Sequence, residues 1–309
     1  MTKSLITAAA AALLLPATLT ITQTMNAAER QNPFMVPYET PFEIPPFEQI
    51  KYEDYVPAAT EGINRLKAET EAIANQKAKP TFENTILAME KSGELLNRVM
   101  LVFGSLDETD NTPEMNEIAE KIYPMYSQVS DEISMNEKLF KRVKTLYDNR
   151  NSLGLPANEV RAIEESYKSF TRNGALLSGK QKKKLSEINT KLTDLYLKYN
   201  KNLLAATNAC EIVVDDKAAL AGLPDALVAT AAEEAKSRGK EGKWVFTLHA
   251  PSRLPVLQYG DNRDLRRQMY ESYTSLASSG QYNNYPLINE IVKLRAEKAS
   301  LLGYKNYAD

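Results

Sequence analysis

The chain has 309 residues, of which 43% are hydrophobic and 25% are charged. Such a length and composition are typical of a globular protein with one large or two smaller folded domains. Its 38 basic and 40 acidic residues leave a formal net charge of -2, which gives no electrostatic reason to expect a nucleic-acid partner. The main basic cluster, Lys180–Lys184, precedes a helical pattern, and we interpret it as a solvated helix end.

Residues 1–28 have the pattern of a secretory signal peptide. Lys3 supplies a positive charge, and an apolar run rich in Ala and Leu extends from Leu5 to Leu15. The run is too short to span a bilayer, so a cleaved signal is favoured over a membrane anchor. We expect cleavage near Ala27 or Ala28 and a secreted or periplasmic protein.

Residues 29–57 are rich in Pro, Phe and Tyr. The fixed φ angles of several prolines exclude a regular helix and predict an extended segment. The density of aromatic side chains predicts that this segment docks on the body of the protein.

Helical periodicity dominates the next part of the chain. Only 12 of the 309 residues are Gly, which favours helices over strands and turns. Thr81 is a suitable N-cap for the second apolar pattern, and Pro124 predicts a kink or break in the third. Apolar residues recur at steps of three and four in the ranges 56–74, 82–96, 115–133, 160–170 and 185–203.

The pattern changes after residue 209. Two short β-rich runs, 210–214 and 244–248, flank a small helical insert and predict a minor two-stranded sheet near residues 210–248. Helices follow, one starting at Pro251 and Pro255, one capped by Asp261 and Asn262, and one over residues 286–302 with Gly303 as C-cap. The predicted fold class is therefore mostly α with a minor two-stranded β element.

No catalytic constellation can be assembled from these residues. A catalytic zinc site needs three protein ligands, and the chain has a single His, His249, and a single Cys, Cys210. We interpret both as structural, with substrate contact in a longer protein as the alternative for His249. The pairs Glu164–Glu165 and Glu233–Glu234 are adjacent on predicted helices, where neighbouring side chains point about 100° apart, so neither pair is an acid–base dyad. We predict no catalytic and no metal-binding residue, and we assign no substrate-binding residue.

Four segments together resemble the M3 family of zinc metallopeptidases, in particular its peptidyl-dipeptidase and oligopeptidase A branch. They follow one another in the family's order and extend over nearly the whole chain after residue 28. The segments are Pro45–Ala58, Pro80–Ile86, Leu254–Arg266 and Leu294–Ala308.

The resemblance implies a mostly helical, two-lobed enzyme with a deep channel that admits short peptides. In that family one zinc ion is held by a His-Glu-x-x-His helix and a downstream Glu, and the motif's own Glu activates the zinc-bound water. These ligands belong to the C-terminal half of the family, beyond Asp309, so none is carried over to this chain. The chain alone is therefore expected to be inactive and to bind no zinc, and its missing partner is the C-terminal catalytic half.

The resemblance also implies a domain organisation. A signal peptide (1–28) and an extended segment (29–57) precede a helical N-terminal lobe (58–239) and the truncated start of the catalytic domain (240–309). With its partners missing, the helix at 286–302 is expected to expose part of its apolar face and to promote association.

Three functions stay open at this stage. The favoured one is the N-terminal fragment of a secreted peptidyl-dipeptidase, which releases C-terminal dipeptides from short peptides. The second is a non-catalytic helical protein that binds peptides or partners. The third is an endopeptidase of the same family.

Overall fold

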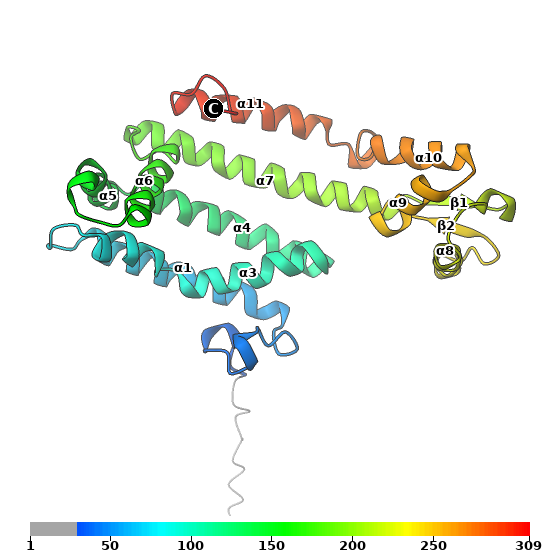
Figure 1. Ribbon diagram of the computed structural model, residues 1–309, viewed down its shortest axis with the longest axis horizontal. Helices are drawn as coiled ribbons and strands as arrows, with labels where there is room; N and C mark the ends of the chain where they lie inside the picture. Colours follow the sequence, from blue (N-terminus) through cyan, green and yellow to red (C-terminus); the bar gives the residue numbers. More distant parts are fainter. Residues whose placement is uncertain (1–29) are drawn as a thin grey trace, which may run out of the picture.

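The computed structural model describes residues 30–309; the predicted signal peptide lies outside the described residues. Helices make up most of the described chain, with one two-stranded sheet at one end (Figure 1). The elements are α1 (Tyr52–Ala74), α2 (Ala88–Glu90), α3 (Glu94–Thr109), α4 (Pro113–Ser134), α5 (Glu137–Asn149), α6 (Ala157–Arg172), α7 (Gly179–Ala209), β1 (Ile212–Val214), α8 (Asp225–Ser237), β2 (Trp244–Phe246), α9 (Ala250–Tyr259), α10 (Arg263–Thr274) and α11 (Tyr285–Leu301).

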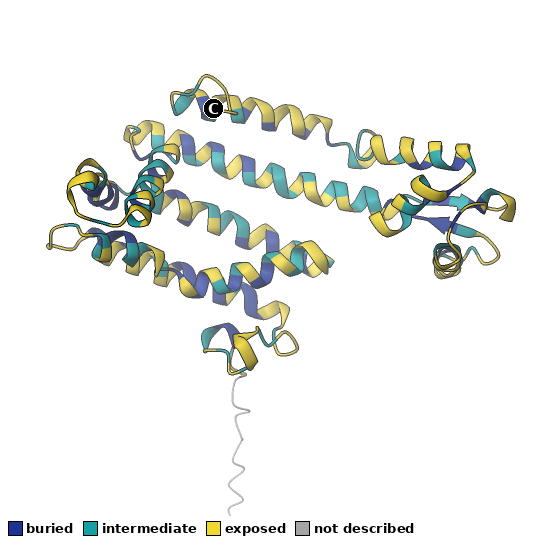
Figure 2. Ribbon diagram, viewed as in Figure 1, coloured by how far each residue is buried: buried dark blue, intermediate teal, exposed yellow. Residues whose placement is uncertain are grey.

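The long helices are stacked in layers. Figure 1 shows α1 with α3, then α4, then α7, and finally α11. The buried residues follow the contacts between successive layers, whereas the outer faces of α3 and α11 are largely exposed (Figure 2). Helix α7 is therefore the shared wall between α4 on one side and α11 on the other.

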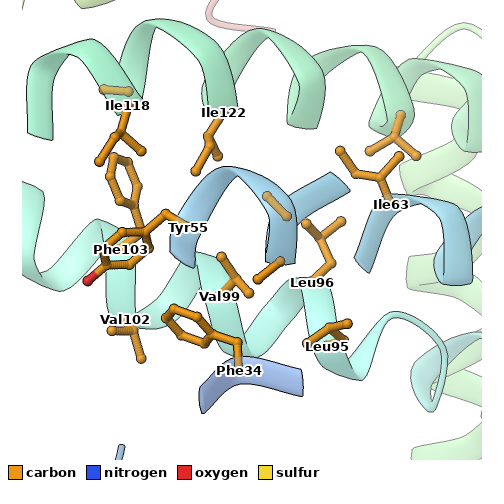
Figure 3. Close-up of a cluster of buried hydrophobic side chains, with 14 of the residues drawn as sticks. Phe34, Tyr55, Ile63, Leu95, Leu96, Val99, Val102, Phe103, Ile118 and Ile122 are labelled. Carbon is orange, nitrogen blue, oxygen red and sulfur yellow. The ribbon is translucent and has the colours of Figure 1, made fainter. Parts of the chain in front are cut away.

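The core between α1, α3 and α4 is built on aromatic rings (Figure 3). Tyr55 of α1 lies 5.3 Å from the ring of Phe34 and 5.3 Å from that of Phe103, and Phe103 in turn lies 5.6 Å from Tyr123 of α4. Centroid separations of this size with tilted planes are favourable for aromatic pairs. The aromatic rings therefore join three helices and the N-terminal segment.

The N-terminal segment docks on this core, as the sequence predicts, but only through part of its aromatic residues. Phe34 is fully buried, and the Arg98 guanidinium donates hydrogen bonds to the carbonyls of Phe34 (3.3 Å) and Val36 (2.9 Å). Phe42, by contrast, is 97% exposed. The docked part therefore includes the stretch beside Arg98, and Asn32 also donates to the carbonyl of Asp54 in α1 at 2.8 Å.

Helix α1 starts earlier than predicted, at Tyr52, so the segment predicted as extended to residue 57 is helical over its last six residues. The Asp54 carboxylate accepts a hydrogen bond from the backbone N–H of Lys51 at 2.7 Å and closes the first turn. Pro57 removes one intrahelical bond, and the burial of Tyr55 and Ala58 beside it offsets that loss.

Two further predictions differ from the structure. The pattern over 82–96 is split: a π-helical turn Phe82–Leu87 continues into α2, and α3 begins only after Gly93, which has a φ of 77°. Thr81 is the predicted N-cap, accepting from the N–H of Asn84 at 3.2 Å. Helix α4 runs unbroken through Pro124, so the predicted break is wrong; Ile122 and Val129 are buried on either side and hold the helix in place.

The minor sheet forms as predicted. Strands β1 and β2 pair antiparallel, with Val213 opposite Val245 and Ile212 opposite Phe246. Their buried side chains share a cluster with Leu220, which lies between the two strands in the sequence, and with Met269 of α10. This confirms a mostly α fold with one two-stranded β element within 210–248.

The last three helices carry the predicted caps. Pro251 lies in the first turn of α9, while Pro255 lies inside that helix and does not mark its start. The Asn262 side chain caps α10 by accepting from the N–H of Leu265 at 3.0 Å. The C-cap residue of α11 is Leu302, one residue before the predicted Gly303, which has a φ of 85° and so adopts the left-handed conformation that follows many helices.

A partly buried polar chain joins α4, α7 and α11. The Asn189 amide donates to the Asp131 carboxylate at 2.7 Å, and the Lys298 ammonium donates to the Asn189 side-chain oxygen at 2.7 Å. Burial raises the pKa of Asp131, which the hydrogen bond from Asn189 and the charge of Lys298 partly oppose. Burial lowers the pKa of Lys298, an effect that Asp131 partly opposes. We call these three residues the Asp131–Lys298 chain.

Replacing Lys298 is expected to destabilise the protein in a pH-dependent way. Lys298→Met leaves the buried carboxylate without its counter-charge and should cost about 1–3 kcal/mol at pH 7, measured by urea unfolding. A carboxyl with a raised folded-state pKa adds stability as pH falls through that pKa, because the folded state then binds the proton more tightly. The deficit of Lys298→Met should therefore shrink on acidification, as Asp131 becomes neutral.

The control is an exposed ion pair between Lys184 of α7 and Glu297 of α11, at 3.4 Å. Lys184→Met should change the unfolding free energy by less than about 0.5 kcal/mol at any pH. Equal losses for the two lysine variants, or a Lys298→Met deficit independent of pH, would contradict a buried charge pair.

Candidate functional site

His249 and Cys210 are the residues whose side chains could most readily act as a base, nucleophile or metal ligand. Both have contacts that fit a structural role. His249 is the N-cap residue of α9, and its exposed ring lies 3.1 Å from the Asn208 side-chain oxygen. Cys210 ends α7 and packs against the sheet cluster, where burial raises the pKa of its thiol. A raised pKa disfavours the nucleophilic thiolate.

Three of the four glutamates in the acidic pairs form ion pairs, and Lys182 of the basic run binds a backbone carbonyl. Glu164 accepts from Arg150 at 3.0 Å and Glu165 from Lys168 at 2.9 Å, while Glu234 pairs with Arg238 at 2.6 Å. Lys182, in the basic run, donates to the carbonyl of Met135 at 3.0 Å. These groups are charged surface and helix-end partners, as the sequence indicates.

A cavity of about 560 Å³ lies between the C-terminal part of α3, the first half of α4 and the second half of α7. We call it the α3–α4–α7 cavity. Its lining combines carboxylates, side-chain amides, hydroxyls and a few aliphatic residues. Pockets of a few hundred cubic ångströms with polar groups among apolar walls are the usual form of small-ligand sites. This cavity is therefore a candidate binding site within residues 30–309.

Hydrogen bonds fix the polar side of the cavity. The Asp107 carboxylate accepts from the Tyr123 hydroxyl at 2.9 Å and from the Asn111 amide at 2.7 Å. Asn116 then donates to the Asn111 side-chain oxygen at 2.7 Å and to the carbonyl of Thr112 at 2.9 Å. Residues of α3 and α4 and of the turn between them are thereby held in one arrangement.

The charge of this wall is negative. Burial, followed by the charge of Asp107, raises the pKa of Tyr123, so its hydroxyl keeps its proton and donates to Asp107 at physiological pH. Lys201 also lines the cavity, but its ammonium is paired with Glu120 at 2.8 Å. Within residues 30–309, neither Asp107 nor Glu108 has an ion-pair partner.

The opposite wall connects the cavity to α11. Tyr196 of α7 lines the cavity, and its hydroxyl accepts a hydrogen bond from Arg295 of α11 at 2.8 Å. The Arg295 guanidinium also lies over the Tyr196 ring, 5.3 Å from its centroid. The α7 wall is thus fixed from behind by the C-terminal helix.

Sequence reasoning assigned none of these cavity residues. The only local signal is a cluster of polar side chains, Asp107, Asn111 and Asn116, where α3 ends and α4 begins. The cavity appears only when α7, about ninety residues further along, packs beside them.

The chain is similar to known peptidases over most of its length. The model of peptidase family M3 matches residues 256–309, which include the end of α9 and all of α10 and α11. The chain is 35% identical over 278 residues to dipeptidyl carboxypeptidase of Escherichia coli strain K12, a match that covers 90% of this chain and 41% of that protein. It is 34% identical over 277 residues to oligopeptidase A of the same organism, covering 88% of this chain and 41% of that protein. The organellar oligopeptidase A of Arabidopsis thaliana is 31% identical over 274 residues, which are 87% of this chain and 34% of that protein.

These similarities and the helical fold define the class of protein by its relatives, which are named as peptidases. The chain belongs to peptidase family M3, and the predicted resemblance to the N-terminal part of such a peptidase is confirmed. It spans about 41% of the length of the two Escherichia coli relatives.

The zinc that this family implies does not fit the residues described. In residues 30–309 no group of three or more His, Cys, Asp or Glu side chains is placed to hold a metal ion. The ring of His249 has the side-chain oxygen of Asn208 beside it at 3.1 Å, and this pair does not supply the three donors that a catalytic zinc needs. Over the same residues, no helix is both long enough and apolar enough to cross a membrane.

Proposed function

We propose that the chain is part of a zinc-dependent peptidase that hydrolyses short peptides and releases C-terminal dipeptides. Membership of family M3 carries this proposal, together with relatives named as a dipeptidyl carboxypeptidase and an oligopeptidase A. The helical lobe would form one wall of the peptide channel, residues 240–309 would begin the catalytic domain, and the zinc ligands would lie in the remaining part of the enzyme.

The surface of α11 supports the presence of a further partner. Ile291 and Leu294 pack on α7, but Tyr285, Ile288 and Val292 are exposed on the other side of the same helix. These three residues are spaced by three and four, so they form one apolar stripe. An exposed stripe on a helix of the M3 region is the surface that the rest of a catalytic domain would cover.

The proposal is tested on the gene and its complete product. We expect the reading frame to continue past the codon for Asp309 and to encode a His-Glu-x-x-His motif. The purified product should cleave a pentapeptide at its C-terminal end, lose activity with a chelator and regain it with zinc. The 309-residue chain alone should show neither hydrolysis nor stoichiometric zinc binding. A product that is inactive with bound zinc would contradict the proposal, and internal cleavage would favour an endopeptidase.

A non-catalytic peptide-binding protein is the second candidate. The α3–α4–α7 cavity favours it, because all its lining residues are present in residues 30–309. A stop codon directly after Asp309 in the intact gene, combined with peptide binding by the chain, would favour the non-catalytic peptide-binding protein over the peptidase.

We also propose that the protein is exported through cleavage of residues 1–28. The positive charge of Lys3 and the apolar run Leu5–Leu15 support this. Fractionation of cells and N-terminal sequencing should find the mature protein outside the cytoplasm and starting near Ala28. Leu14→Arg should retain the uncleaved form in the cytoplasm.

A further inference from the structure

We propose that a cavity between α8, the end of β2 and α9 binds a peptide segment. The cavity would enclose one bulky apolar side chain, while the adjoining peptide group bonds to the Thr247 hydroxyl. We call it the α8–α9 cavity; its volume is about 480 Å³, and it lies at the sheet end of the molecule (Figure 1). Such a site goes beyond the proposed function and does not depend on it, because binding there requires neither zinc nor hydrolysis.

The end of β2 directs alternate side chains to two different surroundings. Phe246 and Leu248 belong to the buried cluster around the sheet, whereas Val245 and Thr247 line the α8–α9 cavity. Successive side chains of an extended chain point to opposite faces, which accounts for this division. One apolar and one hydroxyl-bearing side chain are thereby placed at the cavity.

The Thr247 hydroxyl is a nearly buried polar group without a partner. Thr247 is 9% exposed, and its backbone N–H donates to the Ser252 hydroxyl at 3.0 Å, but its own hydroxyl forms no hydrogen bond within residues 30–309. The described side-chain atoms that lack a partner and are also fully enclosed belong to Tyr38, Asp131 and Arg142. The Thr247 oxygen is not among them, so it is reached from the cavity that this residue lines. A hydroxyl in this position, able both to donate and to accept, favours a ligand with a peptide N–H or C=O.

The rest of the lining is mainly apolar. Leu227 of α8 and Pro251 and Pro255 of α9 contribute to the apolar wall. Glu234 also lines the cavity, and its carboxylate is paired with Arg238 at 2.6 Å. An apolar side chain buried against this wall would stabilise a complex, whereas a charged ligand would find no unpaired counter-charge. A cavity of this size with apolar walls and one or two polar groups is the usual form of a small-ligand site.

The apolar wall and the free hydroxyl together favour the interior of a peptide over other small ligands. There an uncharged amide stands directly beside an apolar side chain, and the amide can both donate to and accept from a hydroxyl. A free amino acid carries an ammonium and a carboxylate that the cavity does not neutralise. A plain hydrocarbon would use the apolar wall and leave the Thr247 hydroxyl unpaired.

The test is titration of the isotope-labelled 309-residue chain with capped amino acids, followed by NMR. N-acetyl-L-phenylalaninamide should bind with a Kd of about 1 mM, as expected for a ligand of its size. It should shift the amide signals of α8, of residues 245–252 and of α9. N-acetylglycinamide has no side chain to bury and should bind at least about tenfold more weakly. Free phenylalanine should also bind more weakly, because its two charges have no partners in the cavity.

Two pairs of variants locate the site. Thr247→Val removes the hydroxyl and keeps the shape of the side chain, so it should weaken binding about three- to tenfold, whereas Thr247→Ser should stay within about twofold of the unchanged chain. Thr230→Phe adds a ring at an exposed lining position of α8 and should abolish binding by filling the cavity. The matched control Ala229→Phe adds the same ring at the neighbouring exposed position, which is not part of the lining, and should leave the Kd unchanged. Thermal melting of each variant should show that the fold is retained.

The peptide site would be refuted if N-acetyl-L-phenylalaninamide did not bind to folded chain, or if N-acetylglycinamide or toluene bound as tightly. An unchanged Kd in Thr247→Val would also refute it. Binding to the 309-residue chain but not to the complete gene product would show that the rest of the protein covers the cavity, and would equally overturn the proposal. A complete product that binds the compound at this cavity but hydrolyses no peptide would refute the proposed peptidase function alone.

Discussion

Phe103→Ala is expected to lower the free energy of unfolding by about 3–5 kcal/mol, the usual cost of truncating a buried phenylalanine. Phe103 is fully buried in α3, and its ring contacts those of Tyr55 and Tyr123, at 5.3 and 5.6 Å. The substitution therefore removes a side chain that joins α1, α3 and α4 and leaves a cavity between them. Urea unfolding followed by far-ultraviolet circular dichroism measures the loss.

Phe42→Ala is the matched control, because it deletes the same atoms from a side chain that is 97% exposed. Its expected effect is within about 0.5 kcal/mol. If the two variants were equally stable, the aromatic core described for α1, α3 and α4 would be wrong.

Gly62→Ala is expected to destabilise the protein by about 1–3 kcal/mol, although alanine is the better helix former. Gly62 lies in α1 where the backbone of α3 passes close by. A Cβ atom at this position would be 2.8 Å from the Cα and 2.8 Å from the backbone nitrogen of Leu96. Neither atom can move away without a shift of the helix, so α1 and α3 must separate.

Gly104→Ala is the control, since Gly104 is also inside a helix, α3, but a Cβ atom there has no neighbour within 4 Å. At Gly104 only the higher helix propensity of alanine matters, so we expect the substitution to stabilise the protein by about 0.5–1 kcal/mol. Thermal or urea unfolding should therefore give opposite signs for the two substitutions. Stabilisation by Gly62→Ala would contradict the close approach of α1 and α3.

Periodicity in the sequence predicts most helices because their stability depends on one apolar face. The same periodicity is present in α5, although the sequence analysis does not predict this helix. The residues buried at helical spacing there are Leu139, Phe140, Val143 and Leu146. The absence of a break at Pro124 has a tertiary cause, since packing on both sides keeps α4 continuous through a residue that weakens an isolated helix.

Other features depend on contacts between distant parts of the chain, and local sequence does not encode them. Arg142 of α5 is 6% exposed and donates to the carbonyls of Gln76 (3.2 Å) and Ala78 (3.1 Å), more than sixty residues earlier. The α3–α4–α7 cavity also depends on distant contacts, because Asp107 of α3 and Thr207 of α7 both line it although they are one hundred residues apart in the sequence. The resemblance to family M3 predicted the class of protein, but the family's own catalytic motif offers no guidance to this cavity.

The position of α11 has a consequence for the order of folding. Its hydrogen bonds reach back 99 residues from Arg295 to Tyr196 and 109 residues from Lys298 to Asn189. The contacts among α1, α3 and α4 span much shorter stretches of chain, and short loops close at a lower entropic cost. During synthesis the first helices can therefore assemble while α11 is still inside the ribosome. Helix α11 would then dock last, on an α7 surface that already exists.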